Sequence, residues 1–150
     1  SEQHIDFDLD LAVSQSKDNA VYYIQYAHAR VNRMVDVRAP EKNIAFDRTQ
    51  LAHYDVSILV SNTETELLAK LAAYPEIVAR AANSYEPHQI GNYLKELAAL
   101  FHGWYAQDDV KILDEQNIAL SQARLVLSLN VQQVLKNGLT LLGVSAPESM

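Results

Sequence analysis

Apolar residues recur at the spacing of a helix face along most of this chain, and only four glycines and four prolines interrupt the pattern in 150 residues. The clearest stripe places apolar residues at i, i+4, i+7, i+11 and i+14, as in a helix that buries one side: Ile90, Leu94, Leu97, Phe101 and Trp104. A chain of this length is about one domain and can bury a single core. We therefore predict an all-α fold, a helical bundle of about five to six helices.

Caps and prolines divide the chain into segments. Asp18 is a favourable N-cap for a first helix that we expect to run to Asp36. Residues 37–62 lack a clear period and contain Pro40, so we predict a long connection there with at most a short helical turn. The further helices are expected at 63–74, opened by a capping box of Thr63 and Glu66; at 75–84 and from 87 onward, each opened by a proline; and at 118–137, ended by Gly138 as a left-handed cap.

The composition argues against several classes of protein. Cysteine is absent, which excludes disulfides and thiolate zinc sites. The absence of cysteine also fits a reducing compartment, so we expect a cytoplasmic protein. No apolar run approaches the ~20 residues of a membrane span and no signal stretch opens the chain, so we expect a protein that does not enter a membrane. The formal net charge of −7 argues against a broadly basic surface for nucleic acid. A local basic patch is still predicted, because four basic residues stand against two acidic ones between positions 17 and 38: Lys17, Arg30, Arg33 and Arg38 against Asp18 and Asp36.

The predicted helix 18–36 sorts into two stripes at 100° per residue. One stripe is mostly aliphatic and should face the core: Val21, Ile24, His28, Val31 and Val35. The opposite stripe joins tyrosines to arginines: Asn19, Tyr23, Tyr26, Arg30 and Arg33. Tyrosine rings beside guanidinium groups can stack on unpaired bases while arginine holds phosphate or a base edge, which is how single-stranded RNA loops are gripped. The other interpretation is that neighbouring helices bury the tyrosines and the arginines form surface ion pairs; His28 is predicted to be a hydrogen-bonded core histidine.

Other patterns in the chain give weaker indications of a site. Asp6, Asp8 and Asp10 alternate, so in an extended segment they would share one face and could hold a hard cation such as magnesium, or form a solvated edge. The five histidines form no zinc signature, and there is neither a glycine-rich phosphate loop nor a nucleophile elbow. We therefore expect no catalytic residue, metal site or cofactor in this chain.

Several strings of the sequence, taken together and in order, resemble one family. They are FDLDLAVSQSKDNAVYYIQYAHARV at 7–31, LAALFHGWY at 97–105, Ala123-Arg124-Leu125, VLKNGL at 134–139 and the ending GVSAPESM. These strings resemble the C-terminal, DALR-type anticodon-binding domain of arginyl-tRNA synthetases, which are class I aminoacyl-tRNA synthetases. Residues 37–62 match nothing in that pattern. Two positions depart from it: Ala20 stands where the family usually has proline, and Ser149 where it usually has arginine.

The resemblance implies that residues 1–17 are a junction from a catalytic domain and that residues 18–150 are a helical anticodon-binding domain. The parent enzyme would attach arginine to its tRNA with ATP and magnesium, using HIGH- and KMSKS-type motifs that this chain lacks. The chain alone would then be non-catalytic. Its partners would be the anticodon stem-loop of the tRNA for arginine and the catalytic domain of the same polypeptide, and we expect a monomer.

Carried onto this sequence, the family's anticodon-loop contacts fall on Tyr23, Tyr26, Arg30, Tyr105 and Met150. Asn19 and Arg33, from the same stripe, are candidates for additional RNA contacts. Two other functions stay open at this point. One is a free-standing α-helical interaction or regulatory module derived from the same fold, and the other is a carboxylate-based hydrolase that uses Asp6, Asp8 and Asp10.

Overall fold

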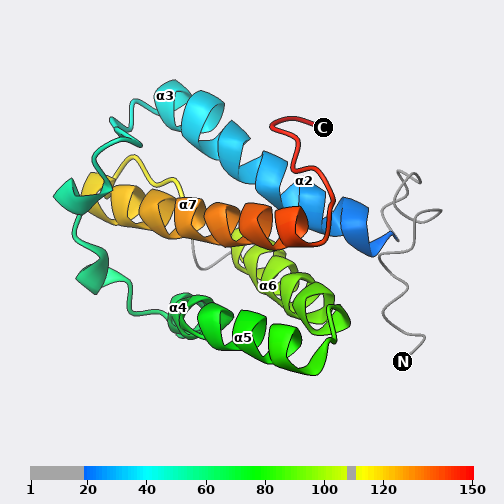
Figure 1. Cartoon of the computed structure of the whole chain (residues 1–150). Helices are drawn as coiled ribbons and strands as arrows, with labels where there is room; N and C mark the ends of the chain where they lie inside the picture. The colour runs from blue at the N-terminus through cyan, green and yellow to red at the C-terminus, as the bar shows by residue number, and fades with distance from the viewer. Residues whose placement is uncertain (1–18, 108–110) are drawn as a thin grey trace.

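The computed structural model describes residues 19–107 and 111–150, and this part of the chain consists of helices, turns and loops without a strand (Figure 1). The predicted all-α class is confirmed. Its long helices are α2 (Ala20–Arg33), α4 (Asn62–Ala72), α5 (Tyr74–Ser84), α6 (His88–Tyr105) and α7 (Ile118–Leu141). The predicted junction at 1–17, with Asp6, Asp8 and Asp10, lies outside the described residues.

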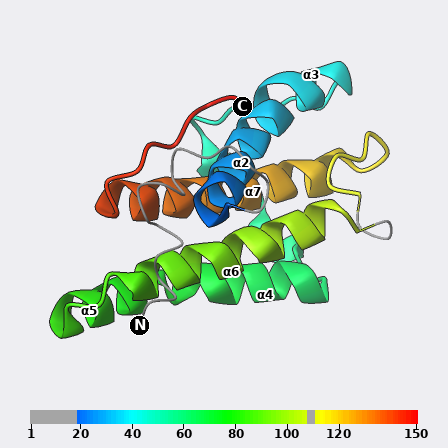
Figure 2. The same cartoon turned by 90° about the vertical axis from the view of Figure 1, so that its right-hand side faces the viewer.

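Three helices, α2, α6 and α7, pack against one another and enclose most of the core, while α4 and α5 cover the other side of α6 (Figures 1 and 2). The apolar stripe of α6 is buried as predicted, with Leu94, Leu97, Phe101 and Trp104 fully inaccessible and Ile90 nearly so. The aliphatic stripe of α2 is buried as well. The opposite side of α2 is only partly covered, because its tyrosines and Arg30 are half-buried and Arg33 is exposed.

The first helix begins and ends later than the sequence predicts. Asn19 is its N-cap, because the Asn19 Oδ1 accepts from the backbone N–H of Val21 at 2.8 Å. At the other end the chain does not leave the helix at Asp36: it widens into a π turn, η2 (Met34–Arg38), and closes with one α turn, α3 (Ala39–Glu41). Pro40, which has no N–H to donate, sits where the hydrogen-bonding pattern changes.

The long connection is consequently shorter than predicted. It covers 42–61 and contains two 3-10 turns, η3 (Leu51–His53) and η4 (Val56–Ile58). The capping box of α4 was also misplaced by two residues. It is formed by Ser61 and Glu64, whose side chains each bond the other's backbone N–H. Pro75 lies in the first turn of α5 as predicted, whereas Pro87 is the N-cap of α6.

Glu64 also connects three helices. It is only 1% exposed. The Glu64 Oε2 accepts from the Nε of Arg124 on α7 at 2.8 Å and from the indole N–H of Trp104 on α6 at 3.3 Å. Arg124 also donates to the backbone oxygen of Lys111 at 2.5 Å. The arginine of the Ala123-Arg124-Leu125 string is therefore a structural residue of the core.

Gly138 does not cap α7, which continues to Leu141. Gly138 is buried against α6, where an added Cβ would lie 2.6 Å from a methyl carbon of Leu94. The sequence predicted a left-handed cap, but glycine is present at 138 because two helices approach closely. The left-handed conformation belongs to Gly143, with φ of 77°, two residues after the helix ends.

We predict that Arg124→Met destabilises the fold by about 3–5 kcal/mol, because it leaves the Glu64 carboxylate buried without its cation. Urea unfolding followed by circular dichroism measures the change. The matched control is Arg80→Met, which breaks the exposed Arg80–Glu76 pair and should have little effect. Similar midpoints for both variants would contradict the structural role of Arg124.

Candidate nucleic-acid interface

Arg30 lies between two tyrosine rings that come from different helices. Its Cζ atom is 4.8 Å from the ring centroid of Tyr26, one turn earlier in α2, and 4.2 Å from that of Tyr105, the last residue of α6. A cation within about 6 Å of an aromatic face is attracted by the ring quadrupole. The guanidinium also donates to the hydroxyl of Tyr26 at 3.5 Å. These three side chains form one preformed unit, which we call the Arg30 cluster.

His102 of α6 supports this cluster from behind. The Nδ1 atom of His102 is 3.0 Å from the Nη1 of Arg30, and its Nε2 is 3.3 Å from the backbone oxygen of Tyr23. A guanidinium can only donate and a carbonyl can only accept. The ring is therefore neutral, with its proton on Nε2. Burial lowers the pKa of His102 and so does the charge of Arg30, although the bond to Tyr23 acts in the opposite direction.

The last residues of the chain, 143–150, run along α2 in the same direction as the helix (Figure 1). We call this segment the tail. Gln25 donates through its Nε2 to the backbone oxygen of Ser145 at 2.8 Å, and the Nδ1 of His28 lies 3.0 Å from the backbone oxygen of Pro147. Because that oxygen can only accept, the Nδ1 of His28 carries the proton. His28 is buried and hydrogen-bonded, as predicted.

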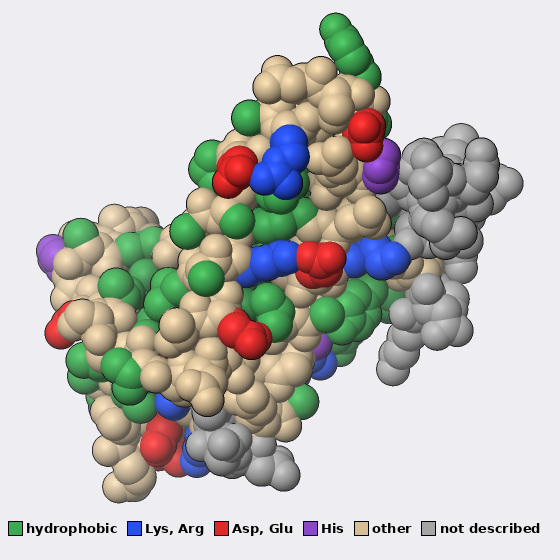
Figure 3. All heavy atoms as spheres, turned by 90° about the horizontal axis from the view of Figure 1, so that it is seen from below, with side chains coloured by type: hydrophobic (Ala, Val, Ile, Leu, Met, Phe, Trp, Pro, Cys, Tyr) green, Lys and Arg blue, Asp and Glu red, His purple; other side chains and the backbone are tan. Residues whose placement is uncertain are grey.

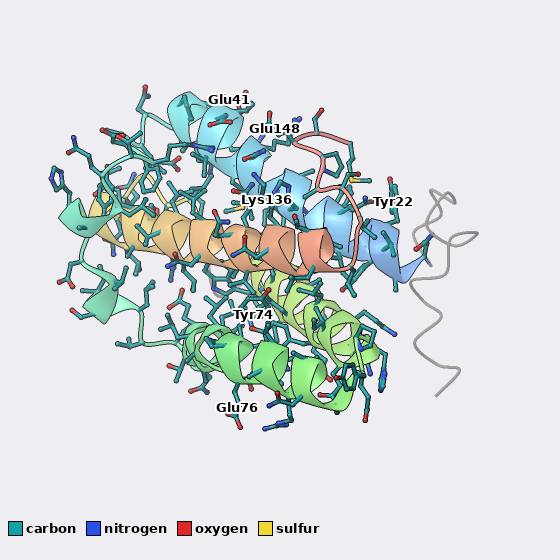
Figure 4. The ribbon with its side chains drawn as sticks, in the orientation of Figure 1. Tyr22, Glu41, Tyr74, Glu76, Lys136 and Glu148 are labelled. Atoms are coloured by element: carbon teal, nitrogen blue, oxygen red, sulfur yellow. The ribbon has the colours of Figure 1, made fainter. Side chains whose placement is uncertain are left out.

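One turn further on, Asn32 donates to the backbone oxygen of Glu148 at 3.4 Å. The orientation of Asn32 is fixed from α7, since the Nε2 of Gln132 donates to its Oδ1 at 2.7 Å and to the backbone oxygen of His28 at 3.1 Å. Figure 4 shows Glu148 above α2 and Tyr22 toward the N-terminal end of that helix. The polar residues of α2 thus hold the tail in place from Ser145 to Glu148.

The Arg30 cluster separates two hollows in the surface. The first has a volume of about 430 Å³; its wall includes Tyr105, the basic residues Arg33 and Arg38, and the tail residues 148–150. We call it the tail pocket. The second, of about 380 Å³, is bounded by Tyr22, Tyr23, Tyr26, Arg30, His102 and Ala106, and we call it the tyrosine pocket. Tyr26 and Arg30 line both pockets, so their side chains form the wall between them. Each pocket is large enough to accept a planar group.

The structure brings most of the predicted site residues together. Those that line the tail pocket are Tyr26, Arg30, Arg33, Tyr105 and Met150, and Tyr23 lines the adjoining tyrosine pocket. Asn19 is not among them, because it is 4% exposed and its side chain caps α2. Sequence reasoning did not select Tyr22 or His102. Tyr22 lies in the string at 7–31 and His102 in the string at 97–105, both of which resemble the family. Neither residue belongs to the tyrosine–arginine stripe predicted for helix 18–36.

Three arginines, Arg30, Arg33 and Arg38, line the tail pocket together with two acidic residues, Asp36 and Glu148. Arg38 is also paired with Glu41, and Asp36 with Arg48. The face seen in Figure 3, from the side of α4 and α5, differs: acidic and basic side chains alternate there and neither gathers into a patch. Helix α5 carries the ion pair Arg80–Glu76, and the pair Lys70–Glu96 joins α4 to α6. Within residues 19–107 and 111–150, no group of three His, Cys, Asp or Glu side chains could hold a metal ion, and no helix is long and apolar enough to cross a membrane.

Comparisons with known proteins show the family of this chain. The DALR anticodon binding domain family matches residues 24–150, which is most of the chain. The chain belongs to this family. The Arg30 cluster, the tail and helix α2 from Ile24 onward fall within the matched region, whereas Tyr22 and Tyr23 precede it. The tail pocket described above is therefore a surface of a DALR domain.

Relatives of this DALR domain are arginine–tRNA ligases. The chain is 68% identical over its whole length to the arginine–tRNA ligase of Acinetobacter baylyi and 52% identical over 99% of its length to that of Psychrobacter cryohalolentis. It spans 24% and 26% of those proteins. Among solved structures, the arginyl-tRNA synthetase of Thermus thermophilus aligns with 90% of the chain at a TM-score of 0.72 and 30% identity, over 22% of its own length. The predicted family and fold are confirmed, and the chain covers about a quarter of the curated relatives.

We predict that the free energy of unfolding decreases as the pH falls below about 6.5, in part because of His28. Burial lowers the pKa of His28 from its ordinary value of 6.5, although its bond to Pro147 acts the other way. The unfolded chain therefore binds the proton first as the pH falls, and it is stabilised relative to the folded chain. His28→Asn keeps a donor near the Nδ1 position without titrating. Denaturant unfolding between pH 7 and 5 should show a shallower decrease for this variant; an unchanged slope would contradict the prediction.

Proposed function

We propose that this DALR domain binds the anticodon stem-loop of the tRNA for arginine as part of an arginine–tRNA ligase. The observation that carries the proposal is the Arg30 cluster, because it places a cation and two aromatic rings between two surface pockets. Unpaired bases stack on aromatic and guanidinium planes, and arginine holds phosphate or base edges. An anticodon loop presents both unpaired bases and phosphates.

The free protein already limits how bases can stack on the cluster. Arg30 covers one face of Tyr26 and one face of Tyr105, so a base uses the outward face of either ring or displaces the guanidinium. Tyr105 is 39% exposed and Met150 is 48% exposed at the rim of the tail pocket. We propose that a loop base enters the tail pocket beside Tyr105 and that Met150 closes over it. Tyr23 and Tyr26 take a second base in the tyrosine pocket.

Electrostatics make this binding local and sensitive to salt. The chain carries a formal net charge of −7, so its overall field repels RNA. Attraction comes from the arginines around the tail pocket, which replace counterions on the phosphates. Arg33 is exposed on the pocket wall and adds a phosphate contact to that of Arg30. Affinity should therefore be highest at low salt.

The remaining functions belong to the parent protein and are proposals for it. The relatives named above are about four times as long as this chain, which covers 24% and 26% of them. This length supports a parent ligase whose catalytic domain uses ATP and magnesium. We propose that residues 1–17 lead from that domain into the helical domain at 18–150. We also propose a monomer located in the cytoplasm. A free-standing regulatory module is not favoured, because the relatives are ligases, and the hydrolase proposed on Asp6, Asp8 and Asp10 has no support among them.

We predict that Tyr26→Ala weakens binding of the anticodon stem-loop by about 1–3 kcal/mol, through loss of one stacking surface. Arg30→Ala should weaken binding and also reduce the slope of log Kd against log salt by about one unit. Fluorescence anisotropy with labelled stem-loop RNA at several salt concentrations measures both effects.

The matched control for the tyrosine is Tyr85→Ala. Tyr85 is 90% exposed where α5 ends and lines neither pocket, so its removal should leave RNA affinity unchanged. Equal affinities for the Tyr26 and Tyr85 variants would contradict the proposed stacking role.

We predict that Ser149→Arg, which restores the residue that the family usually has, strengthens binding at low salt. Ser149 lines the tail pocket, so an added cation there should steepen the slope of log Kd against log salt by about 0.7 to 0.9 unit. The same charge change at Ser84, at the end of α5, is the control. If Ser84→Arg gave the same increase, overall charge rather than position would explain it.

A further inference from the structure

The proposed function assigns no role to His102, which lines the tyrosine pocket. His102 projects from α6 into the space behind Arg30, and its ring lies 4.6 Å from the Tyr23 ring and 5.9 Å from the Tyr26 ring, measured between centroids. It lines the tyrosine pocket but not the tail pocket. Its two nitrogens both have partners, one on each side of the ring.

The side chain of Arg30 needs such a partner. An arginine loses considerable rotamer freedom when it is held in one orientation. Its bond to the Tyr26 hydroxyl, at 3.5 Å, is long. The bond to the Nδ1 of His102, at 3.0 Å, is the shorter of the two. In this geometry His102 and the two flanking rings together fix the guanidinium plane.

We infer that His102 is a positioning residue for RNA binding: its neutral imidazole holds the guanidinium of Arg30 between Tyr26 and Tyr105 and so preorganises the wall shared by the two pockets. This inference rests on the proposed function. It adds a residue of α6 that acts through Arg30. Preorganisation raises affinity because the ordering of the side chain is complete before the RNA arrives.

The imidazole is suited to this role by its tautomer. Nδ1 must accept from Arg30, and this leaves the Nε2 proton to bond the backbone oxygen of Tyr23 on α2. That second bond fixes the ring with respect to the helix that carries Arg30. Burial and the adjacent guanidinium both lower the pKa of His102, which keeps the accepting form present near neutral pH. A lysine or arginine at this position would supply no acceptor.

Two substitutions of nearly equal shape separate the hydrogen bond from packing. His102→Leu removes the acceptor, and we expect stem-loop affinity to fall about tenfold at low salt. His102→Asn places an amide oxygen near the position of Nδ1, and we expect affinity within about twofold of the unchanged protein. In an Arg30→Ala background His102→Leu should cause no further loss, since the residue it positions is gone.

Anisotropy with the synthetic anticodon stem-loop measures Kd for the chain with each single and double substitution, and thermal unfolding is recorded in parallel. A loss with His102→Leu that Asn restores and that vanishes without Arg30 supports the inference. Equal losses in both backgrounds, or with both Leu and Asn, would overturn it and make His102 a packing residue. If Arg30→Ala weakened binding and His102→Leu did not, only this inference would fail. If Arg30→Ala had no effect, the proposed function and this inference would both fail.

Discussion

The buried pair of Glu64 and Arg124 is the interaction on which the rest of the structure depends. A carboxylate and a guanidinium are costly to remove from water, and together they hold three helices in one orientation only when each has its partners. Here α4 supplies the carboxylate of Glu64 and α7 the guanidinium of Arg124, and the indole of Trp104 on α6 donates a further hydrogen bond to Glu64. Tyr105 follows Trp104 in sequence. The internal ion pair therefore also fixes the end of α6 that closes the Arg30 cluster.

Helix α2 connects this core to the surface, because each of its sides contacts a different part of the molecule. Its aliphatic residues are buried against α6 and α7. A row of polar residues, Gln25, His28 and Asn32, binds backbone oxygens of the tail. The tyrosines and Arg30 are half-buried, and Arg33 is exposed. In the DALR domain the site is thus assembled from residues separated by more than a hundred positions in sequence. The tail forms part of the wall of the tail pocket.

Most of the architecture could be predicted because helix periodicity is a local signal. The stripe of α6 and the two faces of α2 follow from 3.6 residues per turn alone. The same signal placed Tyr23, Tyr26 and Arg30 on one side of a helix, and the family resemblance added Tyr105 and Met150. The sequence predictions were wrong where a structure depends on residues far apart in sequence or on an uncommon helical turn. Gly138 resembled a cap until the position of Leu94 was known, and the π turn before Pro40 has no simple pattern. The support of Arg30 by His102, 72 positions apart, requires the packed structure.

The central claim is that the tail pocket and the tyrosine pocket receive an anticodon loop. Photo-cross-linking tests it most directly, with stem-loop RNA that carries 4-thiouridine in the loop and mass spectrometry of the cross-linked peptides. The account predicts cross-links to α2 between Tyr22 and Arg33, to the end of α6 at Tyr105 and to the tail at Glu148–Met150. Cross-links confined to α4 and α5, on the opposite face of α6, would contradict it.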